Sequence, residues 1–342
     1  MIFNRIVLVV LICVLSTGFN VFGQSSNSTN KINPMVHKLI QPPYLQIGDS
    51  VAIVAPSGVL KHKEKEIKLA KDLLESWGLK VKIGNHVFSK SNHFAGTDHE
   101  RAQDLQNVMD NPNIKAIWSA RGGYGTVRIL DMLDFSGFRS NPKWLIGYSD
   151  ITALHNQIHN EGIESMHAMM CTSMSDDMTE YAATVETFKQ ALFGKNLAYT
   201  VEGNTSNKIG KANGQLVGGN LTLLHTMLGS NSSIDTSGKI VFFEEIGEYK
   251  YHIDRMLQSL KRAGYFDNCK GLIVGDMSNM RKNTTSWGSS VEQLILDALK
   301  EYDFPILFDF PAGHEDDNRA LILGRNIQLE VSPTKSTVIF QD

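Results

Sequence analysis

Short apolar runs alternate with amphipathic segments through the first half of the chain, from residue 44 to residue 185. Each apolar run has the length of a buried strand, and each amphipathic segment has apolar residues at helical spacing. The predicted strands and helices, in chain order, are Val51–Val54, Glu64–Trp77, a strand from Lys80, Asp98–Met109, Ile114–Ser119, Trp144–Ile146 and Ile151–His159. This alternation predicts a parallel sheet with covering helices, which is an α/β fold.

The pattern weakens over residues 186–211, where Gly194-Lys195-Asn196 and Gly203-Asn204-Thr205 mark turns, and we place a linker there. A smaller second α/β domain is predicted over residues 212–342. Its predicted elements are a helix Leu221–Leu228 capped by Asn220, a strand Lys239–Phe243, a helix ending at Gly264, strands Leu272–Val274 and Ile306–Phe310, and a closing hairpin Leu321–Val331.

The first 43 residues differ from the rest of the chain. Arg5 precedes an apolar run, Ile6–Leu15, and small residues follow it up to Val21-Phe22-Gly23. This is the pattern of a secretory signal peptide over residues 1–23, and residues 24–43 then form a polar spacer. We expect an exported protein with no stable membrane insertion after cleavage, because the run is too short for a span. An uncleaved anchor is the alternative.

Composition excludes several classes of function. The chain has 342 residues and a formal net charge of −3, so it has no basic footprint for a nucleic acid. Neither a HExxH nor a CxxC pattern is present, and His314-Glu315-Asp316-Asp317 cannot all face one ion without an unusual loop. We therefore expect no nucleic-acid partner, no metal and no cofactor. Cys171 and Cys269 are predicted to be unpaired, because a chain of this size buries a core without a disulfide.

Small and polar residues follow three of the predicted strands: Ser57, the segment Gly122–Gly125, and Ser149. Ligands gather beyond the carboxyl ends of strands in parallel α/β sheets, so we expect these residues to share one site. Ser149, in Gly147-Tyr148-Ser149-Asp150, stands between a strand and a helix, as a nucleophile at a sharp turn does. The helix N-terminus there offers N–H groups to a developing oxyanion. The alternative is a simple helix cap.

A serine nucleophile needs a base and a carboxylate that orients it. His314 and Glu244 are candidates, because both lie at the ends of predicted strands in the second half. Glu245 should point to the opposite face from Glu244 if the strand continues. The segment Gly122–Gly125 lacks the Lys of a phosphate loop and the spacing of a dinucleotide fingerprint. It suits an oxyanion or a substrate backbone, because glycine permits close approach; a plain tight turn is the alternative.

Taken together, these motifs resemble the LD-carboxypeptidase family, the muramoyl-tetrapeptide carboxypeptidases, which includes the microcin C immunity peptidases. The resemblance runs from about residue 44 to residue 340, with six motifs in order. The matching stretches are Gly48–Ser57, Arg121–Gly125 with Arg128, Ile146–His155, Gly218–Leu221, Phe243–Glu245 through Asp254–Leu257, and Gly313-His314 near Asn318. Departures are His167-Ala168-Met169, where many members have His-Gly-Pro, and Ile322, near which many have proline.

The resemblance implies a catalytic triad with Ser149 as nucleophile, His314 as general base and Glu244, or the adjacent Glu245, as the orienting carboxylate. It also implies an oxyanion hole, which we place at the backbone N–H groups of Gly123 and Asp150. The residues expected to contact the substrate are Arg121, Gly122, Tyr124 and Gly219. Arg121 or Arg128 can grip a substrate carboxylate with two hydrogen bonds, and an ion pair within the protein is the alternative for each.

The implied fold is an N-terminal parallel-sheet domain that resembles class I glutamine amidotransferases, a smaller C-terminal α/β domain, and a site between them. Homodimers are frequent in the family. The implied reaction removes the terminal D-alanine from an L,D-linked murein tetrapeptide, which an exported protein meets in the periplasm. Two rival hypotheses are a related peptidase that acts on peptide–nucleotide antibiotics and a periplasmic solute-binding protein without catalytic activity.

Overall fold

A computed structural model describes residues 39–341 of the chain. The predicted signal peptide and most of the polar spacer lie outside these residues. Within them, no helix combines the length and the apolar character that a membrane span requires. Cys171 and Cys269 are free thiols, as the sequence predicts.

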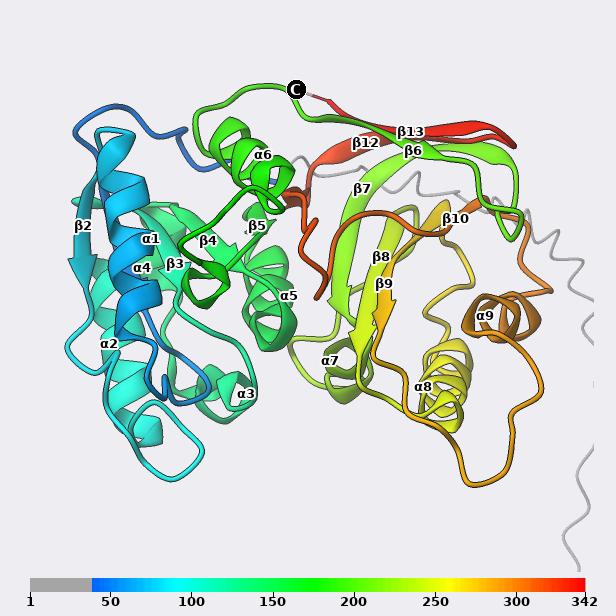
Figure 1. Cartoon of the computed structure of the whole chain (residues 1–342), viewed down its shortest axis with the longest axis horizontal. Coiled ribbons are helices and arrows are strands. Elements are labelled where there is room, and N and C mark those ends of the chain that lie inside the picture. Colours follow the sequence, from blue (N-terminus) through cyan, green and yellow to red (C-terminus); the bar gives the residue numbers. More distant parts are fainter. Residues whose placement is uncertain (1–38, 342) are drawn as a thin grey trace, which may run out of the picture. The chain divides into compact units, whose positions relative to one another are not determined.

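The first sheet has six strands, in the order β11-β5-β4-β3-β1-β2. Figure 1 labels β2, β3, β4 and β5 of this sheet. Five are parallel, and β11 runs antiparallel to β5. The strands are β1 (Ser50–Val54), β2 (Lys80–Ile83), β3 (Ile114–Ser119), β4 (Trp144–Gly147), β5 (Ser165–His167) and β11 (Leu321–Leu323). The helices of this part are α1 (Glu64–Ser76), α2 (Asp98–Asp110), α3 (Thr126–Ile129), α4 (Ser136–Ser140) and α5 (Thr152–Asn160).

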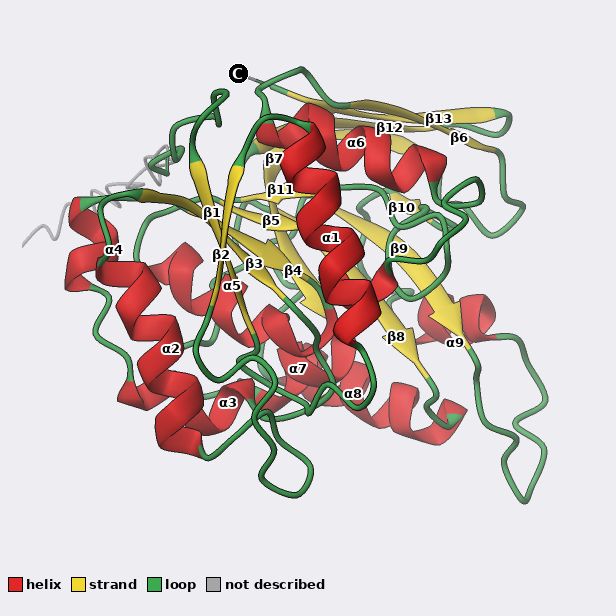
Figure 2. Cartoon of the chain, turned by 60° about the vertical axis from the view of Figure 1, so that its left-hand side comes forward, coloured by secondary structure: helices red, strands yellow, loops and turns green. Residues whose placement is uncertain are grey.

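Helices cover both faces of this sheet, which explains why its inner strands β1, β3 and β4 are mostly apolar and buried. Val51 and Ile53 belong to one buried cluster together with Ile67 of α1. Ala52 and Val54, whose side chains point the other way, belong to a second cluster with residues of α2 and α5. Figure 2 shows α1 in front of the strands of this sheet.

The second sheet has seven strands, in the order β10-β9-β8-β7-β12-β13-β6. The four strands from β10 to β7 are parallel, and β12, β13 and β6 add to β7 antiparallel. The strands are β6 (Ala198–Glu202), β7 (Gly210–Asn220), β8 (Ile240–Ile246), β9 (Gly271–Ser278), β10 (Ile306–Leu307), β12 (Asn326–Val331) and β13 (Lys335–Phe340). The remaining helices are α6 (Ala182–Leu192), α7 (Leu221–Thr226), α8 (Lys250–Arg262) and α9 (Val291–Ala298).

Two features join the sheets. The end of β7 packs on the start of α5: the amide of Asn220 donates to Thr152 Oγ1 at 2.9 Å, and a Cβ on Gly219 would lie 2.4 Å from the same oxygen. The chain also crosses from β10 of the second sheet to β11 of the first. His314 lies on this crossing segment, between the two strands.

The structure differs from the predicted elements in three places. The closing hairpin predicted over Leu321–Val331 is wrong, because β11 pairs with β5 while β12 pairs with β7 and β13. The segment 186–211, expected to be a linker, contains most of α6 and the whole of β6. The predicted strand Ile306–Phe310 is shorter, since only Ile306–Leu307 pairs, with β9. The domain boundaries themselves stay a prediction.

Gly218 gives a test of this packing. Its φ is +135°, and a Cβ there would lie 1.8 Å from the backbone oxygen of Phe242 in the neighbouring strand. Gly229 also has a positive φ, +76°, but a Cβ there meets nothing within 4 Å. We predict that Gly229→Ala costs about 1–2 kcal/mol of the free energy of unfolding, and Gly218→Ala more than about 3 kcal/mol. Urea unfolding of both variants measures this difference. Equal losses would contradict the described packing of β7 on β8.

Candidate active site

Ser149 stands at a sharp turn between β4 and α5. Its φ is +61°, in the left-handed region that non-glycine residues rarely adopt. Gly147, at the end of β4, makes room for the turn, because a Cβ there would lie 2.9 Å from Ile151 Cγ1. Ser149 itself stays partly exposed. A strained conformation of this kind costs about 1–3 kcal/mol and persists only where the surroundings hold it.

His314 and Glu244 form a hydrogen-bonded pair. The distance between His314 Nδ1 and Glu244 Oε2 is 2.6 Å. Glu244 is fully buried, and the side chain of His314 is 14 % exposed. The rings of His314 and Tyr148 meet in an edge-to-face arrangement, with 5.0 Å between their centroids, so the imidazole lies beside the residue that precedes Ser149.

The Ser149 hydroxyl makes no hydrogen bond with His314 among the described residues. Such a bond often tightens only when a substrate is bound. The ring contact of Tyr148 with His314 places the imidazole, which is paired with Glu244 of β8, next to the turn after β4 that carries Ser149.

Glu245 has different partners from Glu244. Its carboxylate accepts hydrogen bonds from the Thr222 amide at 2.8 Å and the Thr222 hydroxyl at 2.7 Å, and from Asn220 Nδ2 at 3.2 Å. Both residues lie within β8, whose pairing with β9 is irregular between Phe243 and Glu245, and their separate partners show that the two carboxylates serve different places. The carboxylate that contacts His314 is therefore that of Glu244, while Glu245 holds the start of α7.

The buried acids around His314 change its ionisation. Burial by itself lowers the pKa of His314, but the hydrogen bond with Glu244 and the charges of Glu244, Glu245 and Asp276 outweigh burial, and the pKa is raised. Burial, followed by the charge of Glu244, raises the pKa of Glu245. Burial also raises the pKa of Asp276 to about 6. The imidazolium form of His314 is thus stabilised where a general base would create it.

The segment Gly122–Gly125 lies against Ser149. A Cβ on Gly122 would be 3.1 Å from Ser149 Cβ and 3.3 Å from its Oγ. Gly123 has a φ of +101°. The backbone N–H groups of Gly123 and Asp150, the two predicted oxyanion donors, have no acceptor within the described part of the chain. They are available to an external oxygen.

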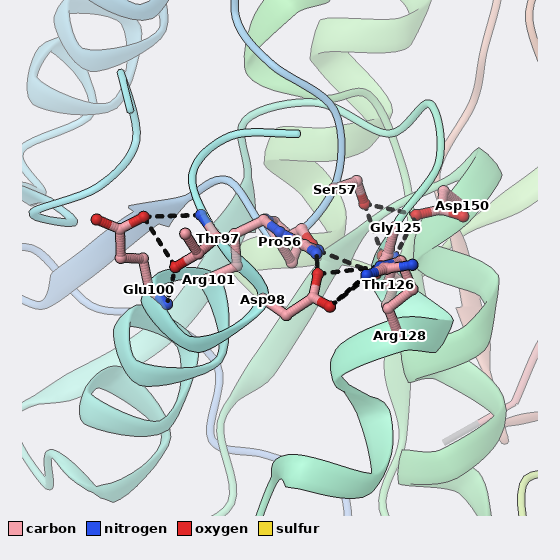
Figure 3. A network of polar contacts seen from close by, with 10 residues as sticks. All are labelled: Pro56, Ser57, Thr97, Asp98, Glu100, Arg101, Gly125, Thr126, Arg128 and Asp150. Carbon is pink, nitrogen blue, oxygen red and sulfur yellow. Dashed lines mark hydrogen bonds and ion pairs between the residues drawn. The ribbon is translucent and has the colours of Figure 1, made fainter. Parts of the chain in front are cut away.

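The side chain of Asp150 joins the segments that follow β1, β3 and β4 (Figure 3). Its Oδ2 accepts a hydrogen bond from the Ser57 hydroxyl at 2.6 Å and from the Thr126 amide at 2.8 Å. The hydroxyls of Ser57 and Thr126 also lie 2.6 Å apart. Ser57, expected at the site from its place after β1, thus lies behind the turn at Ser149 and supports it.

The two candidate arginines differ in their partners. Arg128 forms an ion pair with Asp98 through two nitrogens and packs over the ring of Phe94. This favours the alternative of an internal ion pair for Arg128. Arg121 is partly buried, donates to the Val59 carbonyl at 2.7 Å, and has no carboxylate partner in residues 39–341.

The other predicted substrate contacts lie in two places. Tyr124 is 48 % exposed and its ring lies 5.9 Å from that of Phe94. Gly219 is buried and has a φ of +140°, and a Cβ there would lie 2.4 Å from Thr152 Oγ1. Close packing against α5 therefore accounts for a glycine at this position. A contact between Gly219 and a substrate stays a prediction, as do those of Arg121, Gly122 and Tyr124.

Two residues near the site were not predicted to act there. His167, at the end of β5, lies between the rings of Tyr148 and Phe242. It is fully buried, burial holds its pKa well below the ordinary value, and it is therefore neutral. Asp276 accepts a hydrogen bond at 2.9 Å from the amide of Glu315, the residue that follows His314. The strand was predicted to end at Val274, so nothing in the pattern placed Asp276 at the site.

No group of three or more His, Cys, Asp or Glu side chains in residues 39–341 has the geometry to hold a metal ion. What the arrangement offers is a partly exposed serine at a strained turn, a histidine paired with a buried carboxylate, and two free backbone amides. These are the parts that acyl transfer to a serine hydroxyl requires.

Comparison with known proteins identifies close relatives over almost the whole of the described chain. Residues 51–168 match the LD-carboxypeptidase N-terminal domain, and residues 213–329 match the LD-carboxypeptidase C-terminal domain. A probable murein peptide carboxypeptidase of Bacillus subtilis is 36% identical over 304 residues, which cover 87% of this chain and 94% of the relative. A murein tetrapeptide carboxypeptidase of Pseudomonas aeruginosa is 28% identical over 293 residues, which cover 83% of this chain and 94% of the relative.

Solved structures show the same fold. The crystal structure of muramoyltetrapeptide carboxypeptidase from Oxalobacter formigenes has a TM-score of 0.78 and 28% identity, covering 86% of this chain and 99% of that one. An MccF-like protein from Bacillus anthracis has a TM-score of 0.77 and 25% identity, covering 88% of this chain and 100% of that one.

The pairing of His314 with Glu244 gives a prediction that does not depend on activity. We predict that the pKa of His314 lies above the ordinary value of about 6.5 and falls in Glu244→Gln, because burial then acts without its main opposing partner. In Glu245→Gln the pKa should fall less, since only a charge at longer range is lost. An NMR titration of the imidazole measures all three proteins. A pKa that is unchanged in Glu244→Gln would contradict the pairing.

Proposed function

This chain belongs to the LD-carboxypeptidase family, and we propose that it is a serine carboxypeptidase that hydrolyses the L,D-peptide bond of murein tetrapeptides and releases the terminal D-alanine. The names of its relatives support the substrate. The single observation that carries the mechanism is the 2.6 Å contact between His314 Nδ1 and Glu244 Oε2, beside a serine held at a positive φ.

In the proposed reaction Ser149 Oγ attacks the carbonyl carbon of the scissile bond while His314 Nε2 takes the hydroxyl proton. Glu244 accepts the Nδ1 hydrogen bond, which fixes the tautomer and stabilises the imidazolium. The oxygen of the tetrahedral intermediate accepts hydrogen bonds from the amides of Gly123 and Asp150. His314 then gives its proton to the leaving amine of D-alanine. Water, activated by His314, hydrolyses the ester that remains on Ser149.

Arg121 is proposed to bind the carboxylate of the terminal D-alanine. A guanidinium can grip a carboxylate with two parallel hydrogen bonds. Arg121 directly precedes Gly122, which lies against Ser149, and among the described residues its only hydrogen bond is to the Val59 carbonyl. A carboxypeptidase needs such a cation near the scissile bond, because its substrate always ends in a negative charge.

We also propose that the protein is exported through the signal peptide predicted over residues 1–23 and acts in the periplasm, where murein lies. The apolar run Ile6–Leu15 supports this address. The resemblance of the N-terminal domain to class I glutamine amidotransferases is supported by its parallel strands and by the sharp turn after β4. Homodimer formation rests on the family resemblance.

A second candidate substrate is a peptide–nucleotide antibiotic. The similarity to an MccF-like protein brings it into consideration, and one feature of the site favours it. The half-exposed ring of Tyr124 lies beside those of Phe94 and His93, and exposed aromatic rings can stack on a nucleobase. The sequence pattern did not show this cluster, because His93-Phe94 and Tyr124 lie in different loops.

The proposed function predicts that Ser149→Ala abolishes D-alanine release. Loss of a triad nucleophile lowers kcat by about 10⁴- to 10⁶-fold, and the fold should stay intact because alanine removes only a hydroxyl. The measurement is D-alanine released from purified murein tetrapeptide by the parent, by Ser149→Ala, and by Ser140→Ala. Ser140 is an exposed serine at the end of α4, and its variant should keep parent activity.

Three results would argue against the proposal. Turnover retained by Ser149→Ala would exclude Ser149 as the nucleophile. Cleavage of an aminoacyl-sulfamoyl nucleoside by a parent enzyme that leaves the tetrapeptide intact would favour the antibiotic substrate. Saturable peptide binding without any product would favour the solute-binding hypothesis.

A further inference from the structure

Arg101, on α2, carries a charge that the reaction described above does not use. It is 1% exposed, and burying a guanidinium is costly unless it is paired and hydrogen-bonded. One nitrogen, Nη1, donates to the carbonyl of Pro56 and to that of Gly125, at 2.9 Å for the latter. The other, Nη2, pairs with Asp98. The side chain is therefore committed to two backbone carbonyls and one carboxylate.

The two carbonyls belong to the loops that surround Ser149. Pro56 precedes Ser57 in the loop after β1, and Gly125 ends the glycine segment after β3. The peptide that follows Gly125 donates its Thr126 amide to Asp150, and Ser57 donates its hydroxyl to the same carboxylate. Figure 3 shows Ser57, Gly125 and Thr126 between Arg101 and Asp150.

The glycine segment needs an anchor from outside. Gly122, Gly123 and Gly125 have no side chains, and Tyr124 is half-exposed, so the segment cannot fix itself by packing. Its first carbonyl, that of Gly122, accepts a hydrogen bond from the Gly58 amide at 3.1 Å. Its last carbonyl, that of Gly125, accepts hydrogen bonds from Arg101 Nη1 at 2.9 Å and from the Arg128 backbone amide at 3.2 Å. Arg101 is the one of these two donors that also binds the loop after β1. The amide of Gly123, a proposed oxyanion donor, lies between these two anchors.

We propose that Arg101 is a positioning residue of the oxyanion hole, and this rests on the function proposed above. By holding Pro56 and Gly125 together, it fixes the direction of the Gly123 N–H relative to Ser149. A displaced donor binds the developing oxyanion less well but leaves the bound substrate in the ground state almost unaffected. The loss therefore falls on kcat and not on KM.

Arg128 is a matched control for this proposal. It pairs with the same Asp98 and lies over the same Phe94 ring, 5.0 Å from its centroid against 4.9 Å for Arg101. The side chain of Arg128 is exposed and donates only to Asp98, not to a carbonyl of the loops around Ser149. Its backbone amide donates to the Gly125 carbonyl at 3.2 Å, and a side-chain substitution leaves that bond in place. Replacing either arginine by lysine keeps the charge and removes the planar fork of donors.

The experiment compares Arg101→Lys and Arg128→Lys with the parent in tetrapeptide hydrolysis. For Arg101→Lys we expect kcat to fall about 10- to 100-fold, as for a donor displaced by roughly 1 Å, with KM within about threefold of the parent. Affinity for a peptide boronate that mimics the tetrahedral intermediate should fall by the same factor as kcat/KM. The acid limb of the pH profile should not move, because His314 and Glu244 are untouched. Arg128→Lys should stay within about threefold in every parameter.

Two results would overturn the proposal. One is parent-like kcat in a folded Arg101→Lys. The other is a loss of activity in Arg101→Lys that equals the loss of active sites counted by fluorophosphonate titration. Each remaining site would then have the kcat of the parent, and Arg101 would have a structural role only. If Arg101→Lys does not fold, Asp98→Asn replaces it: this variant weakens the anchor of the guanidinium and should lower kcat in the same way, and an unchanged kcat would overturn the proposal.

A second readout distinguishes failure of this inference from failure of the proposed function. If the parent releases no D-alanine, the rate of fluorophosphonate labelling at Ser149 replaces hydrolysis as the readout, because phosphonylation also places a negative oxygen in the oxyanion hole. Arg101→Lys should then slow labelling by about 10- to 100-fold, while Arg128→Lys does not. Equal labelling rates would overturn the inference, whatever the substrate of the protein is.

Discussion

The backbone of Ser149 at a φ of +61° is the constraint on which the rest of the site depends. A non-glycine residue does not keep this conformation by itself, so the surroundings must hold it. Gly147 and Gly122 give the turn room. Asp150, the residue after the serine, is held in place by its hydrogen bonds with Ser57 and Thr126. What this arrangement gains is a partly exposed serine next to backbone amides that have no acceptor in the described residues, and such strained positions cluster at functional sites.

The proposed nucleophile follows a strand of the first sheet, and the carboxylate that pairs with the proposed base lies in the second sheet, so the proposed site depends on how the sheets are joined. Ser149 follows β4 of the first sheet, and Glu244 lies in β8 of the second. His314 lies on the segment that leaves β10 in the second sheet and enters β11 in the first. Pairing of β11 with β5 therefore fixes one end of the segment that carries His314, the proposed base, and the hydrogen bond with Glu244 fixes its side chain.

The sequence predicted well those elements whose burial is visible in a local pattern. Strands β1, β3 and β4 are mostly apolar and buried because helices cover both faces of the first sheet. The helix predicted to end at Gly264 is α8, whose buried residues Ile253, Met256, Leu257 and Leu260 have helical spacing. The hairpin at Leu321–Val331 was wrong because β11 has three residues and pairs with a strand more than 150 residues away, which no local pattern shows. Glu244 and Glu245 were predicted to face opposite ways, but which face meets His314 depends on the tertiary structure. Arg101 gave no signal, since a charged residue in an amphipathic helix is usually solvated.

The central claim is that one site unites a serine nucleophile, a histidine–glutamate pair and two backbone donors. A crystal structure with a peptide boronate tests it most directly, because the boron takes the place of the attacked carbonyl carbon. The account predicts a covalent bond from Ser149 Oγ to boron, one boronate oxygen within hydrogen-bond distance of the Gly123 and Asp150 amides, and the imidazole of His314 beside Ser149 while still bound to Glu244. A boronate bound without a bond to Ser149, or with its oxygens directed away from both amides, would contradict the account.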